Sequence, residues 1–192
     1  KAEVGYRFDK ARGVKRVVPT IITSSPDQSN ATSSFAKLSD DAQVITPIDT
    51  SFGVVIEKIN ANARVIPNVD PGNEKAYFEA LAHGVVHAAG TNLPGEAGNI
   101  YLFSHSTDAP WNIVRFNAIF YLLRELASGD RVIIFYQGKR YDYIVFDKLI
   151  AEPTDLSYLT NRYNESVLTL QTCDPPGTTS KRLIIRAKLQ GN

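Results

Sequence analysis

The stretch "VLTLQTCDPPGTTSKRLIIRAKL", residues 167–189, holds the chain's single cysteine and predicts how the fold ends. Two β-rich runs, "VLTLQTC" and "RLIIRAKL", are separated by a Pro-Gly turn segment, which is the pattern of two antiparallel strands. Side chains along a strand alternate between faces, so Cys173 lies opposite the core-facing Leu168 and Leu170. A structural cysteine would be expected on the leucine face. Strand parity therefore favours a thiol that is available for chemistry.

Arg182 begins the second of these strands, on the face that corresponds to Cys173. If the two strands pair antiparallel, the thiol and the guanidinium meet at one rim of the sheet. A cation in that place stabilises a thiolate or the oxyanion that forms when a carbonyl is attacked. The alternative is that Arg182 is a solvated surface residue, like Arg186 or Lys188.

Short strand-like runs recur between turn residues over most of the chain. They are "FGVVIEKI" (52–59), "ARVIPNV" (63–69), "NIYLFSH" (99–105) and "RVIIFYQGKRYDYIVFDKLI" (131–150). The first two, separated by Asn-Ala-Asn, form a hairpin-like pair, and the last contains two strands about a turn at Gly138. Together with the final pair they make about seven or eight strands, which predicts a mainly β fold, a closed barrel or a sandwich.

Two segments have the spacing of helices. "NEKAYFEALAHG" (73–84) predicts a short helix that ends at Gly84. In "FNAIFYLLRELASGD" the apolar residues of 116–126 recur three and four positions apart, and Gly129 ends the pattern, which predicts a second helix.

Composition sets the organisation of the chain. With 192 residues and 43% hydrophobic content, one folded domain plus a tail is expected. Residues 23–43 are rich in Ser, Thr, Asp and Asn and read as a linker, so we assign 1–47 to an N-terminal extension and 48–192 to the folded domain. The formal net charge of +1 gives no indication of a nucleic-acid partner. No apolar run reaches the roughly 18–20 residues that span a bilayer.

Three histidines are candidate partners for the thiol. His105 follows a buried strand and precedes a loop, so it is expected at a sheet edge. His83 lies at a predicted helix end, where histidines commonly act as caps, and the role of His87 stays open. A strand-end thiol, a strand-end imidazole and a nearby guanidinium together suggest acyl transfer through a thioester.

These residues resemble the sortases, a family of bacterial cysteine transpeptidases. "TLQTC" (169–173) followed by Arg182 on the next strand is similar to the family motif T-L-x-T-C with its downstream arginine. "GVVHAAGTNLPGEAGNIYLFSHS" (84–106) is similar to the family segment that ends in the catalytic histidine. The likeness spans about residues 48–190. One departure is Ser104, because many members carry Gly at that position.

The resemblance implies an eight-stranded sortase-type β-barrel with short helices, in which 48–192 is the sortase catalytic domain. It implies that Cys173 is the nucleophile, His105 the general acid and base, and Arg182 the group that stabilises the oxyanion and substrate. Cys173 would attack the Thr carbonyl of an LPxTG-like sorting signal on a surface or pilin protein. An amine, from a cell-wall precursor such as lipid II or from a pilin lysine, would then take the acyl group. No metal or organic cofactor is needed.

By the same resemblance, the segment 151–166 would form a wall of the groove that reads the sorting signal. Leu156, Tyr158 and Leu159 could supply apolar contacts there or could be ordinary loop packing. The candidate substrate-binding residues are Leu156, Tyr158 and, beside the thiol, Thr172. The family also implies an enzyme at the extracellular face of the bacterial membrane, held by a hydrophobic anchor outside this sequence.

Two alternatives remain open at this point. An L,D-transpeptidase or another cysteine peptidase would use the same nucleophile, but L,D-transpeptidases place an arginine close behind a Gly-Cys pair, whereas Thr172 precedes Cys173 here and the arginine is at 182. A non-catalytic β-barrel binding domain would leave Cys173 replaceable and His105 merely packed.

Overall fold

A computed structural model describes residues 2–19, 42–106 and 119–191. The chain divides into two compact units, residues 1–46 and 47–192. In the first unit, α1 (Ala2–Arg12) precedes β1 (Lys15–Val17), which pairs in parallel with β2 (Ala42–Val44). Most of the predicted linker, 23–41, lies outside the described residues, and its last residues belong to β2. The extension thus contains a helix and a strand pair that composition did not indicate.

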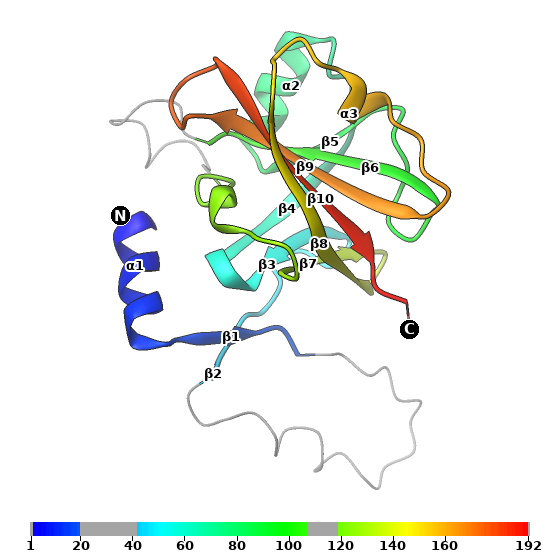
Figure 1. Ribbon diagram of the computed structural model, residues 1–192. Coiled ribbons are helices and arrows are strands. Elements are labelled where there is room, and N and C mark those ends of the chain that lie inside the picture. Colours follow the sequence, from blue (N-terminus) through cyan, green and yellow to red (C-terminus); the bar gives the residue numbers. More distant parts are fainter. Residues whose placement is uncertain (1, 20–41, 107–118, 192) are drawn as a thin grey trace, which may run out of the picture. The chain divides into compact units, whose positions relative to one another are not determined.

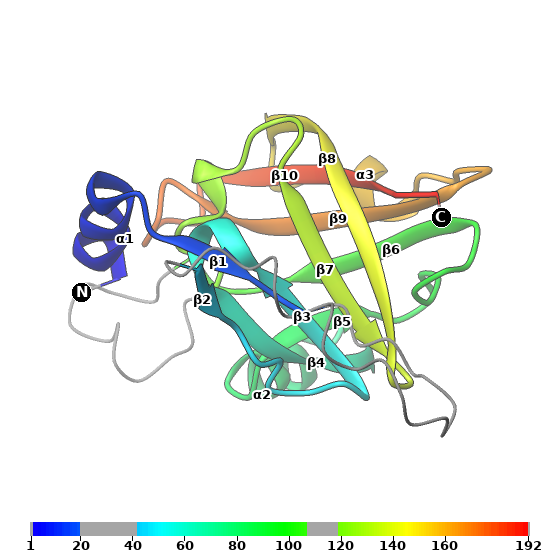
Figure 2. The same ribbon diagram turned by 90° about the horizontal axis from the view of Figure 1, so that it is seen from below.

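The second unit is a closed barrel of eight strands, as predicted (Figures 1 and 2). The strands are β3 (Phe52–Ile56), β4 (Ala61–Val69), β5 (Val85–Ala88), β6 (Gly98–Phe103), β7 (Arg131–Tyr136), β8 (Lys139–Ala151), β9 (Ser166–Asp174) and β10 (Lys181–Leu189). Their order around the barrel is β10, β8, β7, β3, β4, β5, β6, β9. The pairs β4/β5 and β6/β9 are parallel and the other pairs are antiparallel.

Alternation along the strands builds the barrel core. Leu168 and Leu170 of β9 are fully buried, and so are Leu183 and Ile185 of β10. Burying one such side chain contributes about 1.5–3 kcal/mol. The opposite face of β9 and β10 is covered as well over much of its length, where Val167, Thr169 and Ile184 are at most 1% exposed. It is less buried at the end of β9 and the start of β10, where Cys173 and Arg182 lie.

Two predicted strand pairs are confirmed, one of them with a different turn. β7 and β8 are joined at Gln137 and Gly138, which both have positive φ, as a tight hairpin requires. β3 and β4 pair antiparallel, but the chain reverses through the 3-10 helix η1 (Glu57–Ile59) and Asn60 at φ 52°, and the rest of the Asn-Ala-Asn segment already belongs to β4. Asparagine tolerates this left-handed conformation because its short side chain causes little strain there.

The helical predictions have different outcomes. The helix predicted within 73–84 is confirmed as α2 (Glu74–Leu81), where the Asn73 side chain caps the Ala76 N–H at 3.1 Å. In the predicted helix 116–126, residues 116–118 lie outside the described part, and the rest forms turns and the 3-10 helix η2 (Leu123–Glu125). The prediction of an α-helix is wrong for residues 119–126.

The reason lies in the spacing of the buried residues. Phe120, Leu123 and Leu126, all fully buried, are three residues apart, a period that a 3-10 helix matches better than an α-helix. At Leu126 the backbone returns to an extended conformation, and the Leu126 carbonyl accepts a hydrogen bond from Lys148 Nζ at 3.1 Å. One further short helix, α3 (Ser157–Thr160), lies in the connection between β8 and β9.

Candidate active site

The register of β9 and β10 brings the cysteine and the arginine together. In this antiparallel pair Cys173 lies directly opposite Arg182, which confirms the predicted strand pairing. The two side chains therefore emerge beside each other at the end of β9, on the face turned away from the barrel core. Cys173 is a free thiol of intermediate exposure.

His105 reaches the same place from the other neighbour of β9. β6 runs parallel to β9, with Phe103 opposite Gln171, and the Ser104 N–H continues this ladder by donating to the Gln171 carbonyl at 3.2 Å. His105 follows Phe103 by two residues, as Cys173 follows Gln171. Because the two strands run parallel, the imidazole and the thiol lie at the same end of the sheet.

A hydrogen bond between buried groups fixes the segment that carries His105. The Thr172 hydroxyl donates to the Ser104 carbonyl at 2.9 Å, and both residues are at least 95% buried. Thr172 lines the pocket, as a substrate-binding residue would, but its hydroxyl is already engaged. This bond holds the chain next to His105. The hydroxyl of Ser104 is itself buried without a hydrogen-bond partner among the described residues.

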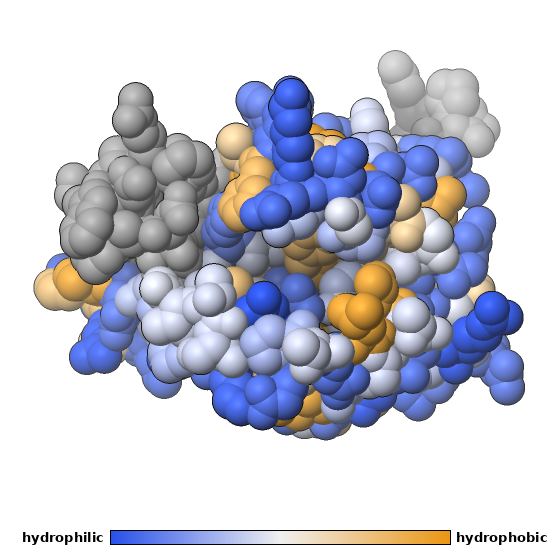
Figure 3. All heavy atoms as spheres, turned by 90° about the horizontal axis from the view of Figure 1, so that it is seen from above, coloured by the Kyte–Doolittle hydropathy of each residue, from blue (hydrophilic) through white to orange (hydrophobic). Residues whose placement is uncertain are grey.

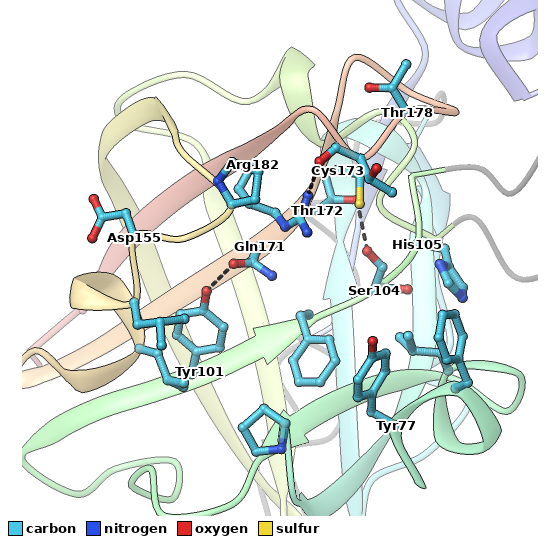
Figure 4. A pocket seen from close by; sticks show the side chains of 18 of the residues that line it. Tyr77, Tyr101, Ser104, His105, Asp155, Gln171, Thr172, Cys173, Thr178 and Arg182 are labelled. Carbon is cyan, nitrogen blue, oxygen red and sulfur yellow. Dashed lines mark hydrogen bonds between the residues drawn. The ribbon is translucent and has the colours of Figure 1, made fainter. Parts of the chain in front are cut away.

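A pocket of about 410 Å³ opens over this end of β6, β9 and β10 (Figure 4). Its polar centre contains Cys173, Arg182, His105 and Gln171. Apolar walls come from α2 and from the β8–β9 connection; they include Tyr77, Phe78, Leu81, Leu156 and Leu159. Figure 3 looks down on α2 and α3, where hydrophobic surface is visible among hydrophilic residues. Leu156 is 62% exposed and Phe78 49% exposed.

The side chains of Arg182 and His105 each have defined neighbours. Arg182 Nη1 donates to the carbonyls of Thr179 at 3.0 Å and Lys181 at 3.1 Å, which holds the guanidinium at the pocket. The His105 ring stacks on Phe78 of α2, with ring centroids 6.1 Å apart and 29° between the planes. Both side chains are thus oriented by groups other than the thiol.

Burial raises the pKa of the Cys173 thiol, and the positive charge of Arg182 offsets part of this effect. Near neutral pH the cysteine is accordingly present as the thiol. A base must remove its proton before it attacks, since the thiolate is the nucleophilic form.

Tyr101 and Gln171 form a polar pair on the pocket floor that sequence reasoning missed. The Tyr101 hydroxyl donates to Gln171 Oε1 at 2.5 Å, and burial raises the pKa of Tyr101, so the phenol stays protonated. Both residues line the pocket. The alternation of side chains along β9 could have indicated Gln171, because it is two residues from Cys173 and therefore on the same face.

Of the two candidate substrate-binding residues on the β8–β9 connection, one lines the pocket and the other does not. Leu156 lines the pocket, whereas Tyr158 is not among the lining residues, and its ring lies 5.9 Å from the Arg186 guanidinium. Leu159 lines the pocket in its place, since residues three apart share one side of a helical turn. The Asn99 side chain fixes this turn by donating to the carbonyls of residues 158 and 159 at 2.9 and 3.1 Å.

The open question about His87 has a structural answer. His87 on β5 is 2% exposed; its Nδ1 accepts from the Asn68 N–H at 3.1 Å, and its Nε2 donates to the Asn92 carbonyl at 3.1 Å. Burial lowers its pKa, which keeps the ring neutral. Neither His87 nor His83 lines the pocket. Within the described residues, no group of three or more His, Cys, Asp and Glu side chains could hold a metal ion.

The barrel and its pocket define a class of protein: a closed eight-stranded β-barrel whose one cysteine shares a pocket with a histidine and an arginine. A family model described as "Sortase domain" matches residues 54–190, well over half of the chain. The chain belongs to the sortase family.

Solved structures agree with this assignment. Sortase C1 of GBS pilus island 1 is 29% identical, with a TM-score of 0.61, and the alignment covers 73% of this chain and 64% of that one. A lid mutant of sortase A from Corynebacterium diphtheriae is 26% identical, with a TM-score of 0.61 and coverage of 75% and 72%. The fold is shared with a sortase D5 transpeptidase from Clostridium perfringens, 24% identical with a TM-score of 0.59 and coverage of 77% and 82%. No curated protein sequence matches the chain.

Proposed function

We propose that this protein is a cysteine transpeptidase that cleaves an LPxTG-like sorting signal and transfers its acyl part to an amine. The observation that carries the proposal is the pairing of Cys173 with Arg182 in the strand register, with His105 lining the same pocket. Membership of the sortase family supports the same chemistry.

In the first half-reaction, His105 takes the proton of the Cys173 thiol, and the sulfur attacks the carbonyl carbon of the signal's Thr. The new C–S bond produces a tetrahedral oxyanion, which the Arg182 guanidinium stabilises. The C–N bond to Gly then breaks, and His105 gives its proton to the departing amine. The product is a thioester on Cys173 and a free peptide amine.

In the second half-reaction, an acceptor amine attacks the thioester and displaces the Cys173 thiolate, which takes back a proton. The acceptor is an amine of a cell-wall precursor such as lipid II, or a lysine of a pilin subunit. Water competes for the thioester, so the apolar walls from α2 and the β8–β9 connection favour transfer by limiting solvent at the sulfur.

The sorting signal lies in the pocket with its apolar residues against Leu156 and Leu159. Thr172 supports the site through its bond to the Ser104 carbonyl. We assign the catalytic domain to residues 48–192 and the N-terminal extension to 1–47, a division close to that between the two compact units.

We also place the enzyme at the extracellular face of a bacterial membrane, where surface or pilin proteins and the amine acceptor meet it. Family membership is the support for this location. No helix within the described residues has the length and apolar character needed to cross a bilayer.

The direct test uses a fluorogenic LPxTG-core peptide with and without an added amine such as triglycine. We expect cleavage by the wild-type chain, a transfer product when the amine is present, and neither in Cys173→Ala. The buried Thr169→Ser variant of the same strand, outside the pocket lining, is a matched control for handling and folding. Turnover that persists in Cys173→Ala would rule out the thiol mechanism.

A further inference from the structure

The backbone around His105 is fixed, but a fixed backbone does not by itself orient the imidazole. Ser104 is 5% exposed and Ser106 is 1% exposed, whereas His105 between them is partly exposed. The Ser104 N–H and carbonyl are both hydrogen-bonded to β9. A side chain on such a backbone still has a choice of staggered rotamers. The direction of the imidazole therefore depends on what the ring contacts.

α2 supplies such a contact through two neighbouring aromatic rings. The His105 ring lies against Phe78 with centroids 6.1 Å apart and 29° between the planes. Phe78 in turn lies against Tyr77, at 4.8 Å and 32°. Both separations fall in the range of about 4.5–7 Å that favourable aromatic pairs occupy. All three residues line the pocket, and Figure 4 shows His105 and Tyr77 on the same side of it, away from Asp155.

The far end of this stack is anchored in the core. Tyr77 and Phe103 of β6 pack against a buried cluster made of Ala80, Leu81 and Val86. The rings of Tyr77 and Phe103 also meet edge to face, with centroids 6.3 Å apart and 74° between the planes. Because packed interiors leave little free space, Tyr77 has a fixed position. Phe78 thus connects the imidazole to a fixed part of the molecule.

Phe78 itself contributes less to the core than a buried aromatic residue does. It is 49% exposed, so only part of its ring is removed from water. The loss of this ring should disturb the fold far less than the loss of a core ring, which costs about 3–5 kcal/mol. An effect of Phe78 on catalysis can therefore be measured separately from an effect on stability.

In the proposed mechanism the imidazole acts in both half-reactions. It carries a proton from the thiol to the departing amine, and it is the base that receives the proton lost by the acceptor amine. Each transfer requires the two heavy atoms to lie within about 2.6–3.2 Å of each other. A ring that turns away from this geometry slows both half-reactions.

We propose that Phe78 is a positioning residue, whose flat ring holds the His105 imidazole in the direction that both proton transfers require. The catalytic part of this inference rests on the proposed function. The contact between the two rings does not, and it is tested separately below.

The kinetic test uses the fluorogenic LPxTG-core peptide, with and without triglycine, and three substitutions of one residue. Phe78→Tyr keeps the flat ring, Phe78→Leu keeps apolar bulk without a flat face, and Phe78→Ala removes both. Phe146→Ala is the matched control, because Phe146 on β8 is 37% exposed and lies outside the pocket lining. kcat, KM and the ratio of transfer to hydrolysis are measured beside a thermal melt.

We expect Phe78→Ala to lower kcat about tenfold to hundredfold, the scale of loss when a reacting group is displaced. Phe78→Leu should lie between Phe78→Ala and the wild type, while Phe78→Tyr and Phe146→Ala should stay close to the wild type. Because both half-reactions slow together, KM for the peptide and the ratio of transfer to hydrolysis should change little. Thermal midpoints should also stay close to that of the wild type.

The ring contact is measured by proton NMR in the absence of substrate. A proton over the face of an aromatic ring is shielded, so the His105 C–H resonances should move downfield in Phe78→Leu and Phe78→Ala. Those of the buried His87 should not move. The chain has three histidines, and a His105→Gln spectrum identifies the resonances of His105.

Wild-type kcat in Phe78→Ala or in Phe78→Leu would overturn the inference. A loss confined to KM, or to the ratio of transfer to hydrolysis, would also overturn it, since it would indicate a substrate contact. So would His105 resonances that are the same in all variants. If the wild type cleaves no peptide, the proposed function fails, and the resonances still decide whether Phe78 orients the imidazole. Phe78→Leu keeps the test usable if Phe78→Ala is unstable.

Discussion

At the scale of single residues, the proposed mechanism requires an arginine, rather than any cation, after the cysteine. Arg182 Nη1 is held by the carbonyls of Thr179 and Lys181, which leaves other N–H groups of the planar guanidinium available to the pocket. A lysine has a single ammonium and cannot satisfy the loop carbonyls and a substrate oxyanion in the same fixed geometry.

Arg182→Lys should therefore lower kcat about 10²–10³-fold, the usual loss when one oxyanion donor is removed. The thermal midpoint should change little, because the residue lies at a pocket rim. The measurement is steady-state peptide cleavage beside a thermal melt. A variant with near-normal kcat would show that the guanidinium does not stabilise the transition state.

The raised pKa of the Cys173 thiol predicts how its reactivity depends on pH. Because burial raises the pKa of Cys173, its thiolate fraction is small at pH 7 and grows only as pH rises through that raised value. Alkylation by iodoacetamide should thus keep accelerating above about pH 8.5, where an ordinary thiol is half ionised. Arg182 lowers this pKa, so Arg182→Gln should move the profile to higher pH.

The rate is followed by intact mass over a pH series. A plateau below pH 8.5, or a shift of the Arg182→Gln profile to lower pH, would contradict the assignment of burial and charge as the opposing influences on this thiol.

At the scale of elements, β9 organises the site because it pairs with β10 on one side and β6 on the other. The first pair sets Cys173 against Arg182, and the second brings the chain toward His105. The bond from Thr172 to the Ser104 carbonyl then fixes the exit from β6.

Thr172→Val removes that hydroxyl and leaves a buried carbonyl unpaired, which should cost about 1–3 kcal/mol in the free energy of unfolding. Cleavage should fall as well, because the segment preceding His105 loses its anchor. Thr172→Ser keeps the hydroxyl and should stay close to the wild type in both respects. Denaturant unfolding and kcat/KM of the three proteins decide this, and equal values for Val and Ser would show that the bond is unimportant.

Some of these elements could be predicted from the sequence, and others could not. Period-two alternation identified the core face of β9 and the pairing with β10, since a shift of one residue would bury Cys173 and expose Leu170. The helix predicted at 119–126 failed because a spacing of three suits more than one helical geometry. Tyr158 was misplaced because the direction of a side chain on a short turn depends on tertiary bonds, here those from Asn99.

At the scale of the whole molecule, the closed barrel supplies a rigid frame on which three side chains from separate strands and loops meet over one pocket. Closure leaves no free sheet edge in the barrel, so the register of each strand is fixed by its neighbours on both sides. The parallel pairing of β6 with β9 was beyond sequence reasoning, since it depends on contacts between segments 70 residues apart, as for Asn99 and Thr169.

In the proposed mechanism, Cys173 carries the acyl group between donor and acceptor. The most direct measurement is the intact mass of the protein after brief mixing with an LPATG peptide and acid quenching, followed by mapping of the modified residue. We expect an added mass equal to the LPAT acyl part on Cys173, which disappears when triglycine is supplied. Cleavage of the peptide without any adduct on Cys173, or with the adduct on another residue, would contradict it.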